Sequence, residues 1–85
     1  MKAITFSPKA LVHLEEWKKA DPKILARIVS LITDIASTPY TGIGKPEPLK
    51  HNLKGAWSRR INEEHRIVYE IKDTAILVLS CRYHY

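Results

Sequence analysis

The sequence has few of the features that mark membrane and secreted proteins. Its 85 residues include a single cysteine, Cys81, so an internal disulfide is excluded and a reducing compartment is expected. The longest apolar stretch, Ala75–Cys81, is interrupted at Ser80 and is far shorter than the roughly 18 residues of a membrane span. Residues Met1–Phe6 lack the apolar run of a secretory signal. We therefore expect a cytoplasmic protein with no membrane partner.

Several kinds of reactive site are missing as well. A zinc site needs three or four cysteine or histidine ligands in paired spacing, whereas this chain has Cys81 and four scattered histidines. A Cys81–His84 nucleophile is disfavoured, because residues three apart point to opposite faces of an extended chain. No glycine-rich phosphate loop of the Walker type is present. We predict that the chain uses neither a metal nor an organic cofactor. Cys81 is expected to lie in the core and His13 on the surface.

What the chain does carry is the composition of one small, folded, basic domain spanning residues 1–85. Lysine and arginine outnumber aspartate and glutamate by 14 to 9, and the hydrophobic content of 45% is too high for a disordered basic tail. A chain of this length buries only about 60–65% of its unfolded surface. A partner protein is therefore expected to add stability.

The first half predicts a strand followed by two helices. Ala3–Phe6 has the composition of a short strand, and Ser7–Pro8 and Asp21–Pro22 each combine an N-cap residue with a proline at the first helical position. Thr38–Pro39 ends the second helix, because a residue before proline is driven out of the helical region. The second helix has one continuous apolar face: Ile24, Ile28, Leu31, Ile32 and Ile35. The first has a narrower stripe: Leu11, Leu14 and Trp17.

The second half predicts an irregular segment and then a sheet. Residues 39–55 hold three of the five prolines and all three glycines, with a short extended piece expected around Leu49–Leu53. Three runs rich in β-branched and aromatic residues then predict an antiparallel meander: Ala56–Ile61, His65–Ile71 and Ala75–Cys81.

Alternation along the middle run assigns its two faces. We expect one set to face the helices: Ile67, Tyr69 and Ile71. The other set should face outward: Arg66, Val68 and Glu70. The element order is β-α-α-β-β-β, an α+β fold with a two-helix hairpin on one face of an antiparallel-rich sheet. The last run is apolar on both faces, so it either lies centrally or has a register that the pattern does not reveal.

Positive charge gathers in one segment of the second half. Between residues 45 and 60, Glu47 is the single acidic residue against five basic ones: Lys45, Lys50, Lys54, Arg59 and Arg60. A basic loop and adjoining strand suit a phosphate backbone. An ordinary solvated surface is the alternative, and charge alone does not distinguish the two.

Three side chains of different chemistry stand out near this segment. Glu47 lies between two prolines, whose fixed φ angles stiffen the loop that presents its carboxylate. Arg66 lies on the outward face of the middle strand, where a guanidinium can stabilise phosphoryl charge. His84 follows an apolar strand and can exchange a proton near neutral pH. The ordinary interpretations are a surface carboxylate, a solvated arginine and a frayed terminus.

A carboxylate, a guanidinium and an imidazole together match the needs of RNA cleavage by the 2′-hydroxyl group. A base takes the hydroxyl proton, a cation stabilises the pentavalent phosphorus, and an acid protonates the departing oxygen, without a metal. Tyr83 and Tyr85 add rings on which bases of single-stranded RNA can stack, each contact contributing about 1–3 kcal/mol.

Four segments carry a family resemblance: GKPEPLKHNL at 44–53, WSRRI at 57–61, EEHR at 63–66 and CRYHY at 81–85. They closely resemble the YoeB (Txe) toxins of bacterial type II toxin–antitoxin systems, in the RelE/ParE superfamily. The match is strong over residues 40–85, whereas the first forty residues match in length and element order.

The resemblance implies a RelE-like, microbial-ribonuclease-type fold and an endoribonuclease that cuts mRNA in the ribosomal A site. Glu47 would be the general base, His84 the general acid and Arg66 the transition-state stabiliser, while Tyr85 shapes the cleavage site. Lys50, His51 and Arg60 match positions that contact RNA phosphates. The full RNA- and ribosome-binding set that we predict is Lys50, His51, Arg59, Arg60, Arg82 and Tyr83.

The same resemblance implies partners and leaves alternatives. The 70S ribosome would be required for activity, a YefM-type antitoxin would fold its C-terminal segment over the basic surface, and homodimerisation is expected from the resemblance alone. A ParE-like inhibitor of DNA gyrase on the same scaffold and a general RNA-binding module are the alternative functions. Mapping mRNA 5′ ends on translating ribosomes separates them.

Overall fold

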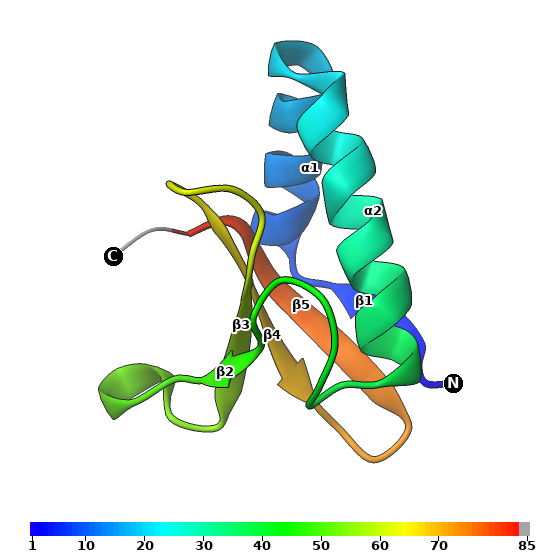
Figure 1. Cartoon of the computed structure of the whole chain (residues 1–85), viewed down its shortest axis with the longest axis vertical. Helices are drawn as coiled ribbons and strands as arrows, with labels where there is room; N and C mark the ends of the chain where they lie inside the picture. The colour runs from blue at the N-terminus through cyan, green and yellow to red at the C-terminus, as the bar shows by residue number, and fades with distance from the viewer. Residues whose placement is uncertain (84–85) are drawn as a thin grey trace.

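The structure, a computed structural model, describes residues 1–83 as a two-helix hairpin against a mixed sheet (Figure 1). The first half contains β1 (Ala3–Phe6), α1 (Pro8–Ala20) and α2 (Pro22–Ser37). The second half contains β2 (Glu47–Pro48), the 3-10 helix η1 (His51–Leu53), β3 (Ala56–Arg60), β4 (Arg66–Ile71) and β5 (Ala75–Tyr83). This is the predicted α+β class, with one further strand, β2. Neither helix in the described part is long and apolar enough to span a membrane.

Both helices begin at the predicted cap signals. The Ser7 hydroxyl accepts a hydrogen bond from the Ala10 N–H at 3.0 Å, and the Asp21 carboxylate accepts one from the Lys23 N–H at 3.1 Å. In each helix a proline occupies the first turn, where its missing donor costs nothing. The predicted boundaries are therefore confirmed, and the local cap chemistry explains them.

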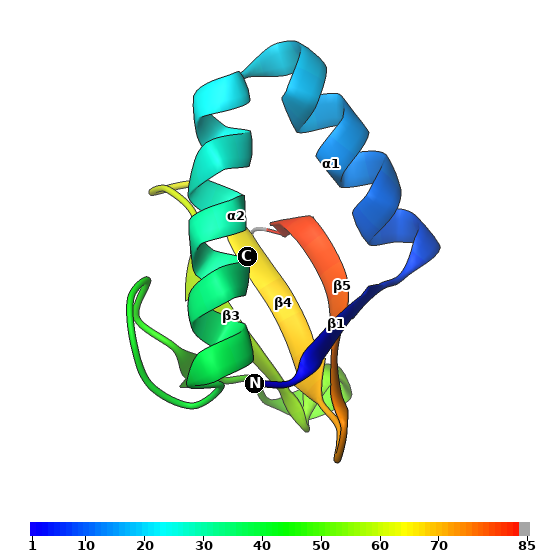
Figure 2. The ribbon, with the colours of Figure 1, turned by 90° about the vertical axis from the view of Figure 1, so that its right-hand side faces the viewer.

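The strand order is β1-β5-β4-β3-β2, and Figure 2 shows the helices over one face of this sheet. β1 pairs with β5 in parallel, whereas the other neighbouring strands are antiparallel. β5 is therefore an interior strand with β1 and β4 on either side, which suits its apolar composition on both faces. The predicted three-stranded meander is confirmed as β3, β4 and β5.

The core lies between the helix hairpin and the sheet. The predicted face of α2 supplies fully buried side chains at Ile28, Leu31 and Ile35. They join a cluster with residues of β4 and β5: Ile67, Tyr69, Ile76, Val78 and Cys81. In α1 the buried positions are Ala10 and Trp17, and the prediction for Leu11 is wrong, because it is 51% exposed.

One strand prediction is wrong, and another holds only in part. The expected extended piece at Leu49–Leu53 is instead a 3-10 turn, and His51 within it has a φ of 60°, which no strand accommodates. Val68 lies on the predicted face, opposite the helices, but it is covered there and only 2% exposed. Its register partner on β3 is Ser58, and the Arg66 side chain reaches Ser58 Oγ at 3.4 Å, so side chains cover this face.

β5 bulges against β4 near its end. Three register pairs reveal this: Tyr69 with Val78, Val68 with Ser80, and Arg66 with Tyr83. Between the first two pairs, β4 advances by one residue and β5 by two. Between the last two pairs, β4 advances by two residues and β5 by three. Each of these intervals therefore contains one extra residue in β5. Bulges of this kind bend a strand and increase its twist.

The prediction that Arg59 binds RNA is wrong, because its side chain is fully buried between α2 and the sheet. Its Nη1 donates to the Asp34 carboxylate and to the Ile43 carbonyl, the latter at 3.1 Å. Nη2 donates to the carbonyls of Thr38 and Thr41 at 2.6 and 2.9 Å. Alternation along β3 turns this residue toward the helices, opposite Ile67 of β4.

Tyr69 completes the buried arginine cluster. Arg59 Nε donates to the Tyr69 hydroxyl at 3.1 Å, and that hydroxyl donates to the Pro39 carbonyl at 2.8 Å. Burial raises the pKa of Tyr69, whereas its hydrogen bond from Arg59 acts in the opposite direction. The guanidinium and the phenol together bind four carbonyls of residues 38–43, so they set the path of the loop that leads to β2.

Two glycines let this loop approach the cluster closely. Gly42 has a φ of 130°, and a Cβ there would overlap Asp34 Oδ2. Gly44 has a φ of 80°, and a Cβ there would stand 2.7 Å from Leu31 Cδ2 and 3.1 Å from the Arg60 carbonyl oxygen. Glycine is required at both positions, because a larger residue would push the loop away from α2.

Removing the buried guanidinium is expected to destabilise the fold. Arg59→Met should lower the free energy of unfolding by about 3–5 kcal/mol, because Asp34 and three carbonyls lose their donor. The matched control is Arg60→Met, which removes the same charge from the exposed neighbouring side chain. Urea denaturation of both variants measures the difference, and equal stabilities would contradict the structural role of Arg59.

Asp34 should make stability depend on pH in the acid range. The hydrogen bond from Arg59 holds the pKa of Asp34 below its ordinary value, an effect that partial burial opposes. A lowered folded-state pKa means that the stabilisation is complete above about pH 4 and is lost as pH falls through the folded value. Asp34→Asn should flatten the decline in melting temperature between about pH 4 and 2. If the melting temperature of Asp34→Asn declines as steeply as that of the unaltered protein, protonation of Asp34 is not the cause of the acid sensitivity.

Candidate functional site

The sheet face opposite the helices brings together two of the predicted catalytic residues. Arg66 Nη1 donates to Glu47 Oε1 at 2.8 Å and lies 3.4 Å from Ser58 Oγ. Glu47 of β2 pairs with Ser58 of β3, and Ser58 pairs with Val68, two residues beyond Arg66 on β4. Alternation places all three polar side chains on the same face. The loop carboxylate and the strand guanidinium are therefore held together by strand pairing.

Backbone geometry fixes the segment that carries Glu47. The two residues of β2 pair with β3, and the Leu49 N–H donates to the Ala56 carbonyl at 2.9 Å. Lys45 and His51, on either side of β2, have φ angles of 58° and 60°, in the left-handed region that such residues rarely adopt. Strained backbone of this kind gathers at functional sites, where the surrounding structure maintains it.

The two charged groups differ in exposure. The Glu47 side chain is 45% exposed, whereas that of Arg66 is 16% exposed. The carboxylate is therefore accessible to a ligand from solvent, whereas the guanidinium is more deeply buried. An incoming anion would reach the carboxylate edge of the pair and compete with it for the guanidinium.

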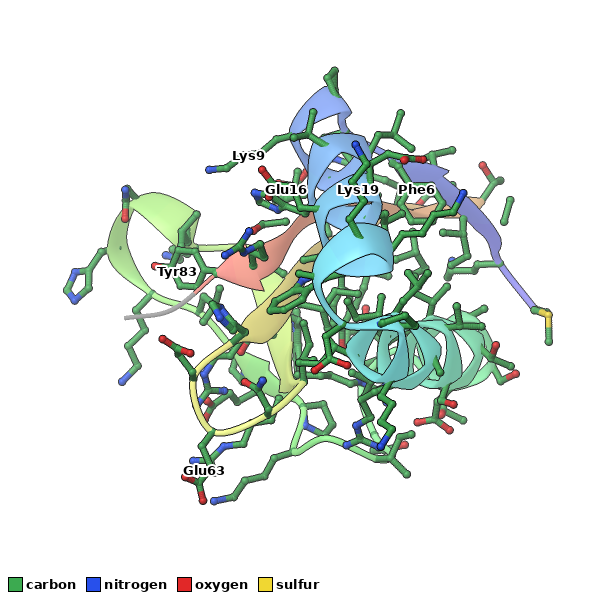
Figure 3. All side chains as sticks on the ribbon, turned by 90° about the horizontal axis from the view of Figure 1, so that it is seen from above. Phe6, Lys9, Glu16, Lys19, Glu63 and Tyr83 are labelled. Atoms are coloured by element: carbon green, nitrogen blue, oxygen red, sulfur yellow. The ribbon has the colours of Figure 1, made fainter. Side chains whose placement is uncertain are left out.

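A cleft of about 360 Å³ adjoins Glu47. Its lining combines polar groups, apolar side chains and one aromatic ring: Glu47, Pro48, Leu49, Lys50, His51, Asn52, Leu53 and Tyr83. Tyr83 is the register partner of Arg66, and Figure 3 shows it beside the loop formed by these residues. The cleft therefore connects the ion pair with the end of β5 and presents the aromatic ring predicted for base stacking.

The predicted binding residues lie in three different settings. Lys50, His51 and Arg60 are exposed, and Arg60 is the register partner of Arg66, so this neighbourhood is cationic. Arg82 lies on α1's side of β5, where its Nη1 donates to Glu16 Oε1 at 3.0 Å. Arg59 is buried on the helix side, so the accessible cationic surface is smaller than the sequence suggested.

The predicted acid His84 and the predicted site-shaping residue Tyr85 lie outside the described residues, so their roles stay predictions. Sequence reasoning missed Ser58, whose buried side chain lies beside Arg66. The alternation that turns Arg59 inward also turns Ser58 toward the site, and this pattern was the signal that could have identified it.

Sequence reasoning also misplaced His13. Its Nδ1 accepts a hydrogen bond from the Cys81 N–H at 3.1 Å, so the side chain faces β5 and is not an ordinary surface group. Cys81 is buried in the core, as predicted. Within residues 1–83, no three histidine, cysteine, aspartate or glutamate side chains gather as metal ligands would.

Comparisons with known proteins place this architecture in context. Residues 6–85 match the protein family described as YoeB-like toxin of bacterial type II toxin-antitoxin system. Toxin YoeB of Escherichia coli K12 is 56% identical over 69 residues, which cover 81% of this chain and 82% of that protein.

Two solved structures are similar over nearly the whole chain. The YoeB dimer from Staphylococcus aureus superposes with a TM-score of 0.92 at 46% identity, covering 99% of this chain and 98% of that chain. The heterotetrameric YoeB-YefM toxin-antitoxin complex from the same organism superposes with a TM-score of 0.89 at 45% identity, covering 100% and 99%. These similarities confirm both the predicted resemblance and the predicted fold.

The Cys81 thiol should be unreactive in the folded chain. Burial raises the pKa of Cys81 to about 12, so at pH 8 its thiolate fraction is about a thousandfold below that of an ordinary cysteine. Iodoacetamide should therefore label native protein at least about a hundredfold more slowly than urea-unfolded protein, as measured by intact mass. Rapid labelling of the native protein would contradict the burial of Cys81 in the core and would make its thiol a candidate nucleophile.

Proposed function

Because the chain belongs to the YoeB-like toxins of bacterial type II toxin–antitoxin systems, we propose that it is an endoribonuclease that cleaves mRNA in the ribosomal A site. The observation that carries the proposal is the Glu47–Arg66 pair, 2.8 Å apart on the face opposite the helices. Exposed Arg60, the register partner of Arg66, and exposed Lys50, which lines the cleft beside Glu47, add positive charge near the pair, which suits a phosphodiester.

The first chemical step uses Glu47 and Arg66 in different roles. A phosphodiester that reaches the site draws the Arg66 guanidinium toward its oxygens, which releases the Glu47 carboxylate to act as a base. Glu47 takes the proton of the 2′-hydroxyl, and the 2′-oxygen forms a bond to the adjacent phosphorus. Arg66 stabilises the negative charge that develops on the pentavalent phosphorus.

The second part of the reaction needs a proton donor at the leaving oxygen. His84 is assigned this role by its place in the CRYHY motif, three residues after Cys81. As the bond from phosphorus to the 5′-oxygen breaks, the imidazolium gives that oxygen a proton. The products are a 2′,3′-cyclic phosphate and a 5′-hydroxyl end, and the proposed chemistry involves no metal.

The ribosome is proposed to supply what the small site lacks. The Glu47 carboxylate is 45% exposed on an open face, so the protein itself encloses little of an RNA strand. In-line attack requires the 2′-oxygen, the phosphorus and the 5′-oxygen to be aligned, and holding them so removes a large entropic part of the barrier. The ribosome would already hold an A-site mRNA in much of this alignment.

Two protein partners belong to the proposal. The related Staphylococcus aureus proteins are described as a YoeB dimer and as a heterotetrameric YoeB-YefM complex. We infer that this chain likewise binds a YefM-like antitoxin and forms a homodimer. Its net charge of +5 favours an acidic, extended antitoxin segment, whose folding on the basic surface would block access to Glu47.

Replacing the proposed base tests the function directly. Glu47→Gln should slow cleavage of mRNA on programmed 70S ribosomes by about 10²–10⁴-fold, because the amide cannot take a proton. The matched control is Glu15→Gln on the exposed part of α1, which should cleave like the unaltered protein. Mapping of 5′ ends over time measures both rates and locates the cut relative to the A-site codon.

Three results would contradict the proposal. Undiminished cleavage by Glu47→Gln would remove the base assignment. Intact mRNA together with inhibited supercoiling by DNA gyrase would favour the ParE-like alternative. RNA binding with a steep salt dependence but no cleavage would favour a binding module.

A further inference from the structure

Three side chains of α1 attach to the end of β5. His13, Glu16 and Trp17 have the spacing i, i+3 and i+4, which places them on one helical face. Glu16 accepts a hydrogen bond from Arg82, whose guanidinium also lies 4.9 Å from the centre of the Trp17 ring. Figure 3 shows Glu16 beside the strand end that leads to Tyr83.

The same helical face binds both backbone groups of Cys81. The Trp17 Nε1–H donates to the Cys81 carbonyl at 2.8 Å, and the Cys81 N–H donates to His13 Nδ1 at 3.1 Å. The Ser80 hydroxyl lies 3.4 Å from the same nitrogen. The N–H and carbonyl of buried Cys81 require hydrogen-bond partners, and side chains of α1 supply them.

These contacts coincide with the second bulge of β5. Cys81 and Arg82 lie between the register pairs Val68–Ser80 and Arg66–Tyr83, where β5 has one residue more than β4. A bulge changes the direction in which a strand continues, so the side chains that fix its backbone also fix the course of the residues beyond it. The next residue is Tyr83, which lines the cleft beside Glu47.

We propose that His13 and Trp17 are positioning residues for RNA cleavage, because they hold the Cys81 peptide groups and so set the course of β5 toward the Glu47–Arg66 site. The inference rests on the proposed function and adds to it two residues from the far side of the sheet. Neither touches the substrate. They act through the backbone of Cys81 on Tyr83, which lines the cleft beside Glu47.

The hydrogen bond from Cys81 specifies the protonation state of His13. Nδ1 accepts a hydrogen bond, so it carries no proton in the folded chain; protonation of this nitrogen would set two N–H donors against each other. Burial lowers the pKa of His13, and nearby Lys9, Arg82 and His65 act in the same direction, while Glu16 opposes them. The acceptor is therefore present at neutral pH and is lost on acidification.

Two substitutions separate the hydrogen bond from simple packing. His13→Asn retains an acceptor at the δ1 position, whereas His13→Leu retains a branched side chain without one. His13→Leu should lower the cleavage rate at saturating programmed ribosomes about tenfold or more and leave the half-saturating ribosome concentration unchanged. His13→Asn should stay within about twofold of the unaltered protein, which a merely space-filling role would not produce.

A stability control accompanies these variants. Ile35→Val trims a buried core side chain of α2 and leaves the His13 and Trp17 hydrogen bonds to Cys81 in place, so it should lower the melting temperature without lowering the saturating rate. If His13→Leu loses no more rate than Ile35→Val, or if His13→Asn loses as much rate as His13→Leu, the positioning role is overturned.

Acidification offers a second readout on the same proteins. Between about pH 7 and 5.5, the unaltered protein should lose rate more steeply than His13→Asn, because only the former loses its acceptor by protonation. All other ionisable groups, His65 and His84 among them, are common to both proteins, so the ratio of the two rates isolates His13. A constant ratio across this range would contradict the inference.

One measurement does not depend on catalysis. In the free ¹⁵N-labelled chain, the Cys81 amide resonance should shift with pH with a midpoint below 6.5, and this shift should vanish in His13→Asn. An unchanged titration in His13→Asn would show that another group is responsible. If the unaltered protein cleaves no mRNA, the proposed function fails, while the Cys81 amide still decides whether His13 holds this strand end.

Discussion

The Arg59 guanidinium is the interaction on which the rest of the structure depends. A buried cation is costly unless every donor has a partner, and here α2, the loop after it and Tyr69 supply all of them. The loop carbonyls can be satisfied only if residues 38–43 follow one path around the guanidinium. That path delivers the chain to β2, so the place of Glu47 beside Ser58 depends on an arginine that never meets solvent.

β3 links this interior cluster to the exposed chemistry. Successive residues of the strand point to opposite faces, so Arg59 fixes the loop on one side while Ser58 and Arg60 contribute to the site on the other. β5 has a comparable arrangement at its end, where α1 holds the backbone from one side and Tyr83 lines the cleft on the other. The helices therefore contribute to the site without lying on the face that carries it.

Local signals allowed the helices and the meander to be predicted. Cap residues, prolines and periodic apolar side chains act within a few residues, so the sequence displays them directly. Arg59 was misjudged because its burial depends on Asp34, 25 residues away, and a basic window gives no sign of such a partner. The parallel pairing of β1 with β5 and the contact from Cys81 to His13 are likewise long-range. Glu47 was singled out by its place between two prolines and Arg66 by its place on the outward face of the middle strand, although only strand register brings them together.

The shortness of β2 has a consequence for the colloidal behaviour of the free chain. β2 is an edge strand of two residues, and Pro48 has no N–H with which to bond a further strand. A long, flat edge would offer a template for pairing with other chains and for fibril growth. The short strand that presents the Glu47 carboxylate therefore also leaves little unpaired backbone at this edge of the sheet, which protects the free chain from aggregation through that edge.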